Sequence, residues 1–182
     1  EMSINYAARN QIPLVIGTTG IEFLTEKMEK ASQKTALLIS PNMSLGINLC
    51  FKLAALAAKA LGEAYDIDII EAHHREKRDA PSGTALKFGS VISESLDKIL
   101  SENAVYGRKG PDSARDDNRI GFQSIRAGDT VGDHTVFFAG DGERIEITHR
   151  ATSRTSFVVG ALRAAKWLIG RDNGLYSFDD IF

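Results

Sequence analysis

Residues 13–40 constrain the fold more than any other part of the sequence. PLVIG (13–17) and TALLIS (35–40) are short apolar runs bounded by turn-forming or polar residues. Such runs are typical of parallel strands that are buried on both faces. IEFLTEKMEKASQK (21–34), between them, carries apolar residues at helical spacing. A strand, a helix and a second strand in so short a stretch form a right-handed crossover unit, which predicts an α/β protein with an open parallel sheet.

The middle of the chain predicts a second domain. SLGINLCFKLAALAAKALG (44–62) has a serine cap and a terminal glycine, as expected of a long helix, and YDIDIIEAHH (65–74) predicts a strand that ends at two histidines. The polar segment 101–119 is expected to be a mobile surface loop. Gly-Asp-Gly joins two later strand patterns as a hairpin signal. The remaining predicted elements are helices at 84–100 and 154–170 and strands at 120–128, 134–140 and 143–151.

Composition excludes several classes of protein. The 22 basic and 24 acidic residues nearly cancel, so no chain-wide field favours nucleic acid. The single cysteine, Cys50, forms no disulfide within the chain and fits a reducing compartment. No apolar run reaches the roughly 20 residues of a membrane span, and no signal peptide is recognisable. We therefore expect a cytoplasmic protein that binds neither nucleic acid nor a membrane.

The chain opens at EMSINYAARN without an initiator methionine. NYAARN is typical of the end of a helix whose start is absent. We therefore expect a fragment of a longer protein.

Two polar loops follow the predicted parallel strands. GTTG (17–20) and SPNMS (40–44) would both lie at carboxyl ends of strands, where open α/β sheets bind their ligands. Gly17 lets the backbone approach a ligand, and Thr18 and Thr19 offer hydroxyl groups. An ordinary turn with a threonine cap remains an alternative. No G-x-G-x-x-G pattern is present, so a phosphate-binding loop would have to lie upstream.

The segment EAHHREKRDAPSGTAL (71–86) concentrates groups suited to catalysis. His73 and His74 are residues of the type whose unperturbed pKa lies near neutral pH, and Lys77 supplies a cation. Pro-Ser-Gly-Thr at the start of a helix offers amides and hydroxyls to an anion. Adjacent residues on a strand point to opposite faces, so a metal site is not expected. The segment predicts a carboxylate or phosphate pocket with a proton donor beside it, as in hydride transfer to an unsaturated acid.

A purely structural role is the alternative for each histidine of the chain. We prefer this role for His134 and His149, which have no comparable neighbours in the sequence.

Residues 71–85 resemble the signature of the dihydrodipicolinate reductase family, E-x-H-H-x-x-K-x-D-A-P-S-G-T-A, at every fixed position. VIGTTG, SPNMSLGIN, RAGDTVGDHTVFF and ERIEITHRATSR resemble further family segments in the same order, so the likeness covers nearly the whole chain. The resemblance implies reduction of 4-hydroxy-tetrahydrodipicolinate to tetrahydrodipicolinate by NADPH or NADH, in lysine and diaminopimelate biosynthesis. It also implies a homotetramer built by pairing the sheets of the substrate domains.

The family resemblance assigns a role to each matching residue. His73 would protonate the substrate, and Lys77 would supply a second proton or steady the developing charge. His74, Ser82, Gly83 and Thr84 would hold the carboxylates. The nicotinamide side of the cofactor site would be lined by Gly17, Thr18, Thr19, Ser40, Pro41, Asn42 and Met43. Met43 departs from the family, which usually has phenylalanine there.

The resemblance also predicts the domain organisation. Residues 1–43 and 155–182 would be the remnant of a Rossmann-type dinucleotide-binding domain. Residues 44–154 would form an α+β substrate and tetramerisation domain with a mixed, largely antiparallel sheet. Family members begin with a glycine-rich strand, turn and helix that grip the pyrophosphate. We therefore expect this chain to bind a dinucleotide poorly.

Two other functions are compatible with the sequence. One is another two-domain NAD(P)-dependent dehydrogenase with a lysine and histidine acid pair. The other is a noncatalytic domain whose sheets serve only to assemble an oligomer. A panel of substrates tests the first alternative. Replacement of His73 by alanine in the full-length protein tests the second, because only a catalytic domain would lose turnover.

Overall fold

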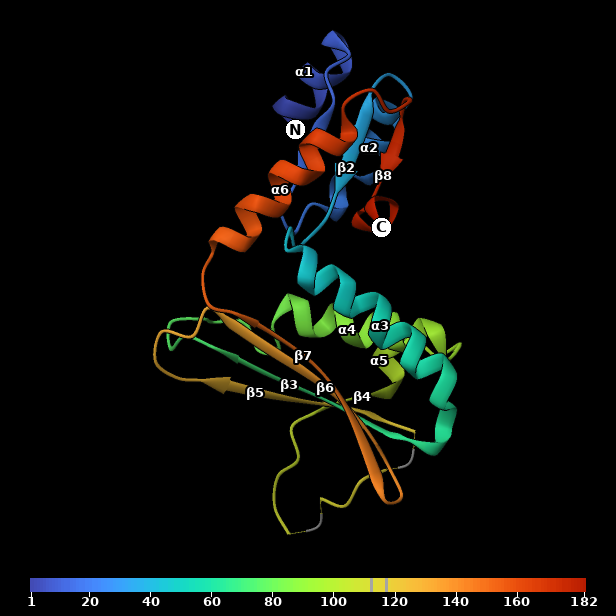
Figure 1. The fold of residues 1–182 in the computed structure, drawn as a ribbon, viewed down its shortest axis with the longest axis vertical. Helices are drawn as coiled ribbons and strands as arrows, with labels where there is room; N and C mark the ends of the chain where they lie inside the picture. Colours follow the sequence, from blue (N-terminus) through green and yellow to red (C-terminus); the bar gives the residue numbers. More distant parts are fainter. Residues whose placement is uncertain (112, 117) are drawn as a thin grey trace. The chain divides into compact units, whose positions relative to one another are not determined.

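The structure, a computed structural model, describes residues 1–111, 113–116 and 118–182. It divides into two compact units (Figure 1). Unit 1 holds residues 1–48 and 154–182, and unit 2 holds residues 49–153. Each unit has its own β-sheet, so the fold is α/β with one parallel and one mixed sheet, which confirms the predicted fold class.

Unit 1 is built on a three-stranded parallel sheet in the order β1-β2-β8. Its strands are β1 (Leu14–Ile16), β2 (Ala36–Ile39) and β8 (Gly174–Tyr176). Its helices are α1 (Met2–Asn10), η1 (Glu22–Leu24), α2 (Thr25–Ser32), α6 (Thr155–Leu168) and η3 (Phe178–Ile181). β8 was not predicted, because three residues are too few to show a periodic pattern.

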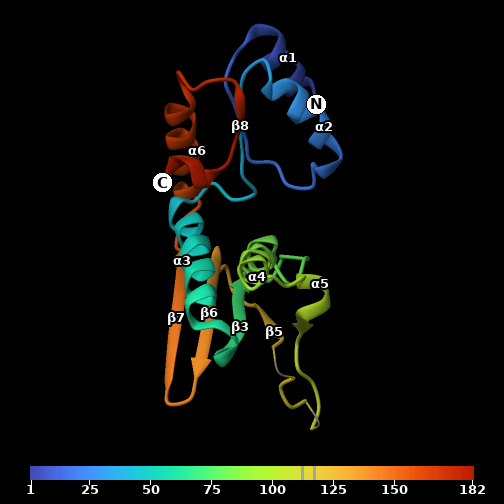
Figure 2. The same cartoon turned by 90° about the vertical axis from the view of Figure 1, so that its right-hand side faces the viewer.

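Both faces of this sheet are covered, as the continuous apolar run of β2 predicts. Leu37 and Leu38 are fully buried, and as consecutive residues of one strand they point to opposite faces. Leu37 packs in a cluster with residues of α1 and α2, whereas Leu38 packs with Ala164 and Leu168 of α6. Figure 2 shows α6 on one side of the sheet and α2 on the other. The two-sided cover buries the faces of the sheet, whereas residues 17–20 of the loop after β1 are exposed.

Unit 2 is built on a five-stranded mixed sheet in the order β4-β5-β3-β6-β7. β3 runs parallel to β5 and antiparallel to β6, so the mixed sheet has two parallel and two antiparallel pairings. Its strands are β3 (Asp66–His73), β4 (Ala104–Tyr106), β5 (Ile120–Arg126), β6 (Gly132–Gly140) and β7 (Glu143–Ala151). Its helices are α3 (Leu45–Leu61), which starts in unit 1, η2 (Gly62–Ala64), α4 (Gly83–Ser95) and α5 (Leu100–Asn103).

The central strand β3 carries the site of interest. Its burial alternates, with Ile67, Ile69, Glu71 and His73 all facing the interior. α3 and α4 lie together on one face of the sheet (Figure 1), where α4 contacts β3 and the rings of Phe51 and Phe88 pack edge to face at 4.7 Å. Every second residue of β3 points into the interior, so Glu71 and His73 are buried on the same face as Ile67 and Ile69.

The expectation of a mobile loop over 101–119 is wrong for its first part, which forms most of α5 and all of β4. Further along, Arg108 Nη1 donates to Asp68 at 2.8 Å, and Arg115 Nε donates to Asp66 at 2.6 Å. These ion pairs fasten the segment to β3. Residues 112 and 117 lie outside the described residues.

One helical segment, Leu45–Ala64, is long and apolar enough to cross a membrane by length and composition alone. The expectation that no segment reaches this length is therefore wrong. Ala54 and Ala58 are fully buried, and Phe51 packs against α4. The apolar composition therefore also serves the interior of unit 2.

Candidate active site

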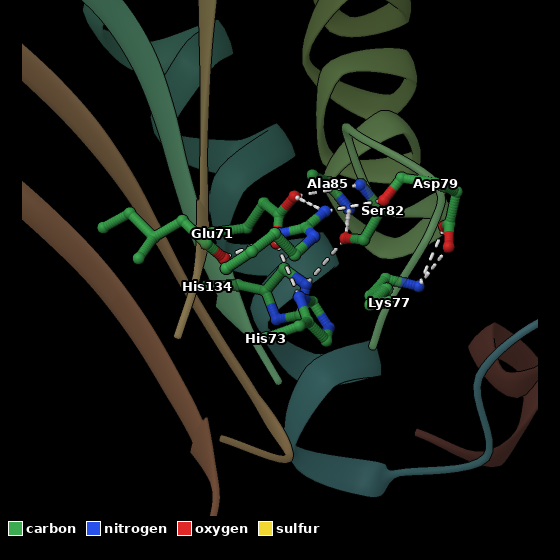
Figure 3. A network of polar contacts seen from close by, with 9 residues as sticks. Glu71, His73, Lys77, Asp79, Ser82, Ala85 and His134 are labelled. Carbon is green, nitrogen blue, oxygen red and sulfur yellow. Dashed lines mark hydrogen bonds and ion pairs between the residues drawn. The ribbon is translucent and has the colours of Figure 1, made fainter. Parts of the chain in front are cut away.

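His73, the last residue of β3, forms a short hydrogen bond with Glu71 two residues earlier. The distance from His73 Nδ1 to Glu71 Oε2 is 2.5 Å (Figure 3). Residues i and i+2 of a strand share a face, so the spacing in the sequence brings these two side chains together. The side chain of Glu71 has no exposed surface, and that of His73 is 11% exposed.

Arg126 at the end of β5 neutralises the buried carboxylate. Its Nη1 donates to Glu71 Oε2 at 2.9 Å and its Nη2 to Oε1 at 2.7 Å, a bidentate arrangement. The parallel register pairs His73 directly with Arg126. Burial raises the pKa of the Glu71 carboxyl, but the hydrogen bonds from His73 and Arg126 outweigh burial and hold that pKa well below its usual range. Glu71 is therefore ionised at neutral pH.

Ser82 caps α4 and closes the site from the helix side. Its hydroxyl accepts from the backbone N–H of Ala85 at 3.2 Å, as an N-cap residue does. Its own N–H donates to Glu71 Oε1 at 3.2 Å, and its Oγ lies 3.0 Å from His134 Nε2. The hydroxyl and amide of Ser82 are thus bonded within the protein. The next residue, Gly83, is exposed, and no heavy atom lies within 4 Å of the position that a Cβ would take.

His134 of β6 belongs to the same cluster. It pairs with Glu71 across the two strands, and its ring packs edge to face on that of His73 with centroids 5.1 Å apart. Burial, with the nearby His73, lowers the pKa of His134 to about 3. His134 is therefore neutral at physiological pH.

Lys77 is tied to its own loop. Its Nζ lies 2.8 Å from both carboxylate oxygens of Asp79, and this contact lowers the pKa of Asp79. The backbone carbonyl of Asp79 accepts from Arg126 Nη2 at 2.6 Å. Figure 3 shows His73, Lys77 and Ser82 in one region near the start of α4. Arg126, Glu71 and Asp79 link these three residues in one bonded network.

His74 lies outside this network and faces a different space. It lines an open cavity of about 470 Å³ together with Arg75, Glu76, Gly128 and Asp129. Adjacent residues of an extended chain diverge, and His73 and His74 do so here.

The two loops of unit 1 meet in space. A Cβ added to Gly17 would lie 3.2 Å from Met43 Cε, so the loops 17–20 and 40–44 are neighbours. The backbone N–H of Ser40 donates to the carbonyl of Ile16 at 3.1 Å, which joins the ends of β2 and β1. Asn42 Oδ1 accepts from the N–H of Ser44 at 2.9 Å. Thr18 and Thr19 are exposed, as is Pro41.

Met43 differs from the other predicted cofactor residues because its side chain is buried in the apolar core of unit 1. Its Cε packs against the backbone of Gly17. A Cβ on Gly160 of α6 would lie only 1.7 Å from the Met43 carbonyl oxygen, so glycine is required for the helix to approach the loop.

Three residues predicted from the sequence lie in this network: His73, Lys77 and Ser82. Glu71 and Arg126 belong to it as well and were not predicted. Glu71 could have been found, since it stands two residues before His73 on the same strand face. Arg126 could not, because only the register of β3 with β5 brings it to the site. Among the described residues, no group of three or more His, Cys, Asp or Glu side chains could hold a metal ion.

Unit 1 has polar loops at the ends of its parallel strands, and unit 2 has a buried imidazole and carboxylate beside a helix N-terminus. This organisation is compatible with an α/β oxidoreductase. Residues 2–43 match the family model "Dihydrodipicolinate reductase, N-terminus", and residues 46–182 match "Dihydrodipicolinate reductase, C-terminus". The chain belongs to the dihydrodipicolinate reductase family and is an oxidoreductase, as the sequence predicted.

Curated relatives agree with the family match. The chain is 50% identical over 179 residues to the 4-hydroxy-tetrahydrodipicolinate reductase of Herminiimonas arsenicoxydans, covering 98% of this chain and 67% of the relative. It is 54% identical over 169 residues to the enzyme of the same name from Alkalilimnicola ehrlichii, covering 92% and 63%. The chain thus spans about two thirds of the length of these relatives.

A solved structure is similar throughout this chain. It is the dipicolinate-bound dihydrodipicolinate reductase of Paenisporosarcina sp. TG-14, with a TM-score of 0.78 and 25% identity, covering 100% of this chain and 69% of that one. The family match does not favour a noncatalytic assembly domain or an unrelated dehydrogenase.

Proposed function

We propose that this protein reduces 4-hydroxy-tetrahydrodipicolinate to tetrahydrodipicolinate with a reduced nicotinamide cofactor, as a step of amino-acid biosynthesis. The observation that carries the proposal is the buried pair of His73 and Glu71 beside the N-terminus of α4. The relatives named for this reaction support it. Reduction needs a hydride, a proton and loss of the ring hydroxyl as water. The bound nicotinamide supplies the hydride, and the protein supplies the proton.

His73 is the proton donor in this proposal. Its Nδ1 is bonded to Glu71, which leaves Nε2 to face a ligand. When the ring is charged, Nε2 carries the proton that it can deliver to the substrate, while the Nδ1–H stays bonded to Glu71. Lys77 is paired with Asp79 in the protein without substrate. When a substrate carboxylate takes the place of Asp79, the ammonium group of Lys77 stabilises the negative charge of the substrate.

The start of α4 binds a substrate carboxylate. The first backbone N–H groups of a helix point away from its body and carry partial positive charge. Gly83 is exposed and unobstructed, and Thr84 adds a hydroxyl. Because the Ser82 hydroxyl and amide are engaged internally, Ser82 contributes by shaping the turn and orienting Glu71. His74 would bind the second carboxylate from its open cavity.

The loops of unit 1 suit a nicotinamide ring. Gly17 allows close approach of the backbone, and Thr18 and Thr19 present exposed hydroxyls. Ser40, Pro41 and Asn42 form the adjoining loop, and Met43 supports both loops through the core. These residues fit the nicotinamide part of a dinucleotide, and they do not distinguish NADH from NADPH.

The assembly and cellular location are also proposed. The protein would act in the cytoplasm as a homotetramer, formed by pairing the sheets of unit 2. Among the described strands β7 pairs only with β6, so its other edge is open to a partner. Light scattering on the purified protein should give four chains per particle, and a monomer at micromolar concentration would contradict this part.

Turnover of the substrate tests the catalytic proposal. In the active enzyme, the consumption of NADPH and of NADH is followed in parallel with enzymatically generated 4-hydroxy-tetrahydrodipicolinate. His73→Gln should lower kcat by about 100-fold or more, since a general acid contributes at least this much. Lys87→Gln, an exposed change on α4, is the matched control and should leave kcat unchanged. Equal kcat for His73→Gln and the unaltered protein would reject His73 as the proton donor.

Binding of dipicolinate tests the carboxylate site separately. The similar solved structure binds this dicarboxylate. Calorimetric titration should show binding that weakens when Gly83 is replaced by proline, which removes one amide donor and keeps the φ angle suited to the first helical residue. Unchanged affinity would place the ligand elsewhere.

A further inference from the structure

We propose that Glu71, clamped by Arg126, is a positioning residue that holds the proton of His73 on Nδ1 and so reserves Nε2 for the ligand. The inference deepens the proposed function, on which it rests for the identity of the ligand. Its geometric part, the state of the His73 ring, can be tested without turnover.

The carboxylate of Glu71 is saturated with donors. Oε1 accepts from Arg126 Nη2 at 2.7 Å and from the Ser82 N–H at 3.2 Å. Oε2 accepts from Arg126 Nη1 at 2.9 Å and lies 2.5 Å from His73 Nδ1. With no exposed side-chain surface, Glu71 has no water to serve in place of these four partners.

The donors decide where the proton of His73 lies. An ionised carboxylate only accepts hydrogen bonds. Three N–H groups and the guanidinium charge keep Glu71 ionised, so the hydrogen between Oε2 and Nδ1 belongs to the imidazole. A neutral His73 is therefore the Nδ1–H tautomer with a bare Nε2, and a charged His73 carries its second proton on Nε2.

The surroundings of Nε2 agree with this assignment. Within the described part of the chain, no hydrogen-bond partner for this nitrogen is found. A Cβ added to Gly132 would lie 3.1 Å from Nε2, so the glycine keeps that side of the ring clear. Nε2 is thus the ring nitrogen that can receive a proton from solvent and deliver it to a ligand.

Arg126 extends this positioning to the neighbouring loop. The same Nη2 that binds Glu71 also donates to the Asp79 carbonyl at 2.6 Å, and the Asp79 carboxylate holds Lys77. One guanidinium thus fixes the partner of His73 and the loop of Lys77. Replacing Arg126 should disturb both, whereas replacing Glu71 should first disturb the ring of His73.

The test reads the tautomer of His73 directly. Long-range ¹H–¹⁵N spectra of the 182-residue chain distinguish Nδ1–H from Nε2–H rings, and with four histidines the signal of His73 is assigned by its loss in His73→Asn. The unaltered protein should show the Nδ1–H form whenever the ring of His73 is neutral, and a pH series identifies that state. Glu71→Gln should convert a large part of the population to Nε2–H, since the amide NH₂ only donates and a single amide oxygen cannot accept from both Arg126 and His73. A ring that is Nε2–H in the unaltered protein overturns the proposal.

Matched variants exclude a general loss of structure. Glu63→Gln makes the same chemical change at an exposed ion pair with Lys98 and should leave the His73 signal unmoved. If Glu71→Gln does not fold, Arg126→Lys is tested instead, because it keeps a cation beside Glu71 but cannot make the bidentate contact. It should give a smaller tautomer shift, and an unchanged His73 ring in that folded variant would count against the clamp.

Kinetics complete the test and separate it from the proposed function. In the active enzyme, Glu71→Gln should lower kcat by about 100-fold and move its pH profile, with KM for the cofactor nearly unchanged. A merely structural role would not change the pH profile, so an unmoved profile argues against positioning. If the unaltered protein neither turns over nor binds dipicolinate, the proposed function fails while the tautomer result still decides the positioning proposal.

Discussion

In unit 1 the loops that follow β1 and β2 rest on apolar packing, whereas in unit 2 the end of β3 is held by buried charge. Met43 supports Gly17 from within a core cluster that contains Leu38, Ala164 and Leu168. In unit 2, by contrast, Glu71 has a fully buried carboxylate that is hydrogen-bonded to His73, Ser82 and Arg126. In both units polar groups lie at the end of a strand. Apolar packing holds them in place in unit 1, and a buried ion pair holds them in unit 2.

The difference predicts different sensitivities. Apolar packing depends on shape and volume, and changes little with pH. A buried ion pair depends on both partners, since removing one leaves an uncompensated charge. Unit 1 should therefore respond most to steric changes, and unit 2 to charge and pH. Trp167, the single tryptophan, lies on α6 and reports on unit 1, while hydrogen exchange in β3 and β5 reports on unit 2.

The largest effect is expected from Arg126→Leu. It leaves Glu71 buried without its cation and should lower the free energy of unfolding by about 3–5 kcal/mol. Urea unfolding measures the loss, and hydrogen exchange should rise in β3 and β5. Arg144→Leu removes an exposed pair with Glu146 and should cost less than about 1 kcal/mol. If the two variants lost the same free energy of unfolding, buried charge would not be what stabilises this part of unit 2.

Acidification should destabilise unit 2 through His134. Its pKa is about 3 in the folded protein, against about 6.5 in an unfolded chain. The unfolded state therefore binds more protons below pH 6.5, and stability falls as the pH drops from there toward 3. The loss between pH 6.5 and 4 should reach about 3 kcal/mol.

A pH series of urea unfolding for His134→Gln checks this prediction. The variant should flatten the pH dependence between pH 6.5 and 4. His149→Gln should flatten it less, because His149 is less buried although burial also lowers its pKa. Glu71 contributes to the pH dependence of stability only below the pKa of about 4.3 that its carboxyl has in the unfolded chain. Because its folded pKa is lowered, the free energy of unfolding also falls there as the pH drops. A loss confined to pH below 4 would exclude His134 as the source.

Gly160→Ala tests the packing of unit 1. Its Cβ would overlap the backbone oxygen of Met43, so the helix must shift, at a cost of about 1–3 kcal/mol. Gly121→Ala is the comparison in unit 2, where the Cβ would overlap Asp68 Oδ1, a side-chain atom that can move, although its ion pair with Arg108 must then shift as well. Trp167 fluorescence during unfolding should register the first variant more strongly, and a larger cost for Gly121→Ala would contradict this ranking.

The smallest effect on stability is expected from Thr19→Ala. The side chain is exposed in a loop, so the free energy of unfolding should change by less than about 0.5 kcal/mol. If the loop binds the nicotinamide, cofactor affinity should still fall several-fold, as measured by fluorescence titration. Thr25→Ala on α2 is the control for affinity, and an equal loss of affinity for both variants would argue against a specific role of the loop.

Several elements could be predicted from the sequence because their signals are local. The buried strands, the long helix after Ser44 and the alternation of β3 follow from patterns of a few neighbouring residues. The short strand β8 has no such pattern, and β4 lies in a polar segment whose arginines are ordered by acidic residues of β3. Periodicity cannot reveal an element that distant partners stabilise.

The same distinction applies to the site. The order of residues 71–85 by itself determined the family, the strand that ends at His73 and the helix that begins at Gly83, since each depends on neighbours in the chain. Only the tertiary structure decided that Arg126 neutralises Glu71, that His134 lies against His73, and that the hydroxyl of Ser82 is engaged. These contacts join residues more than fifty positions apart through the register of the sheet, and a charge is stable in the interior only where such a partner meets it.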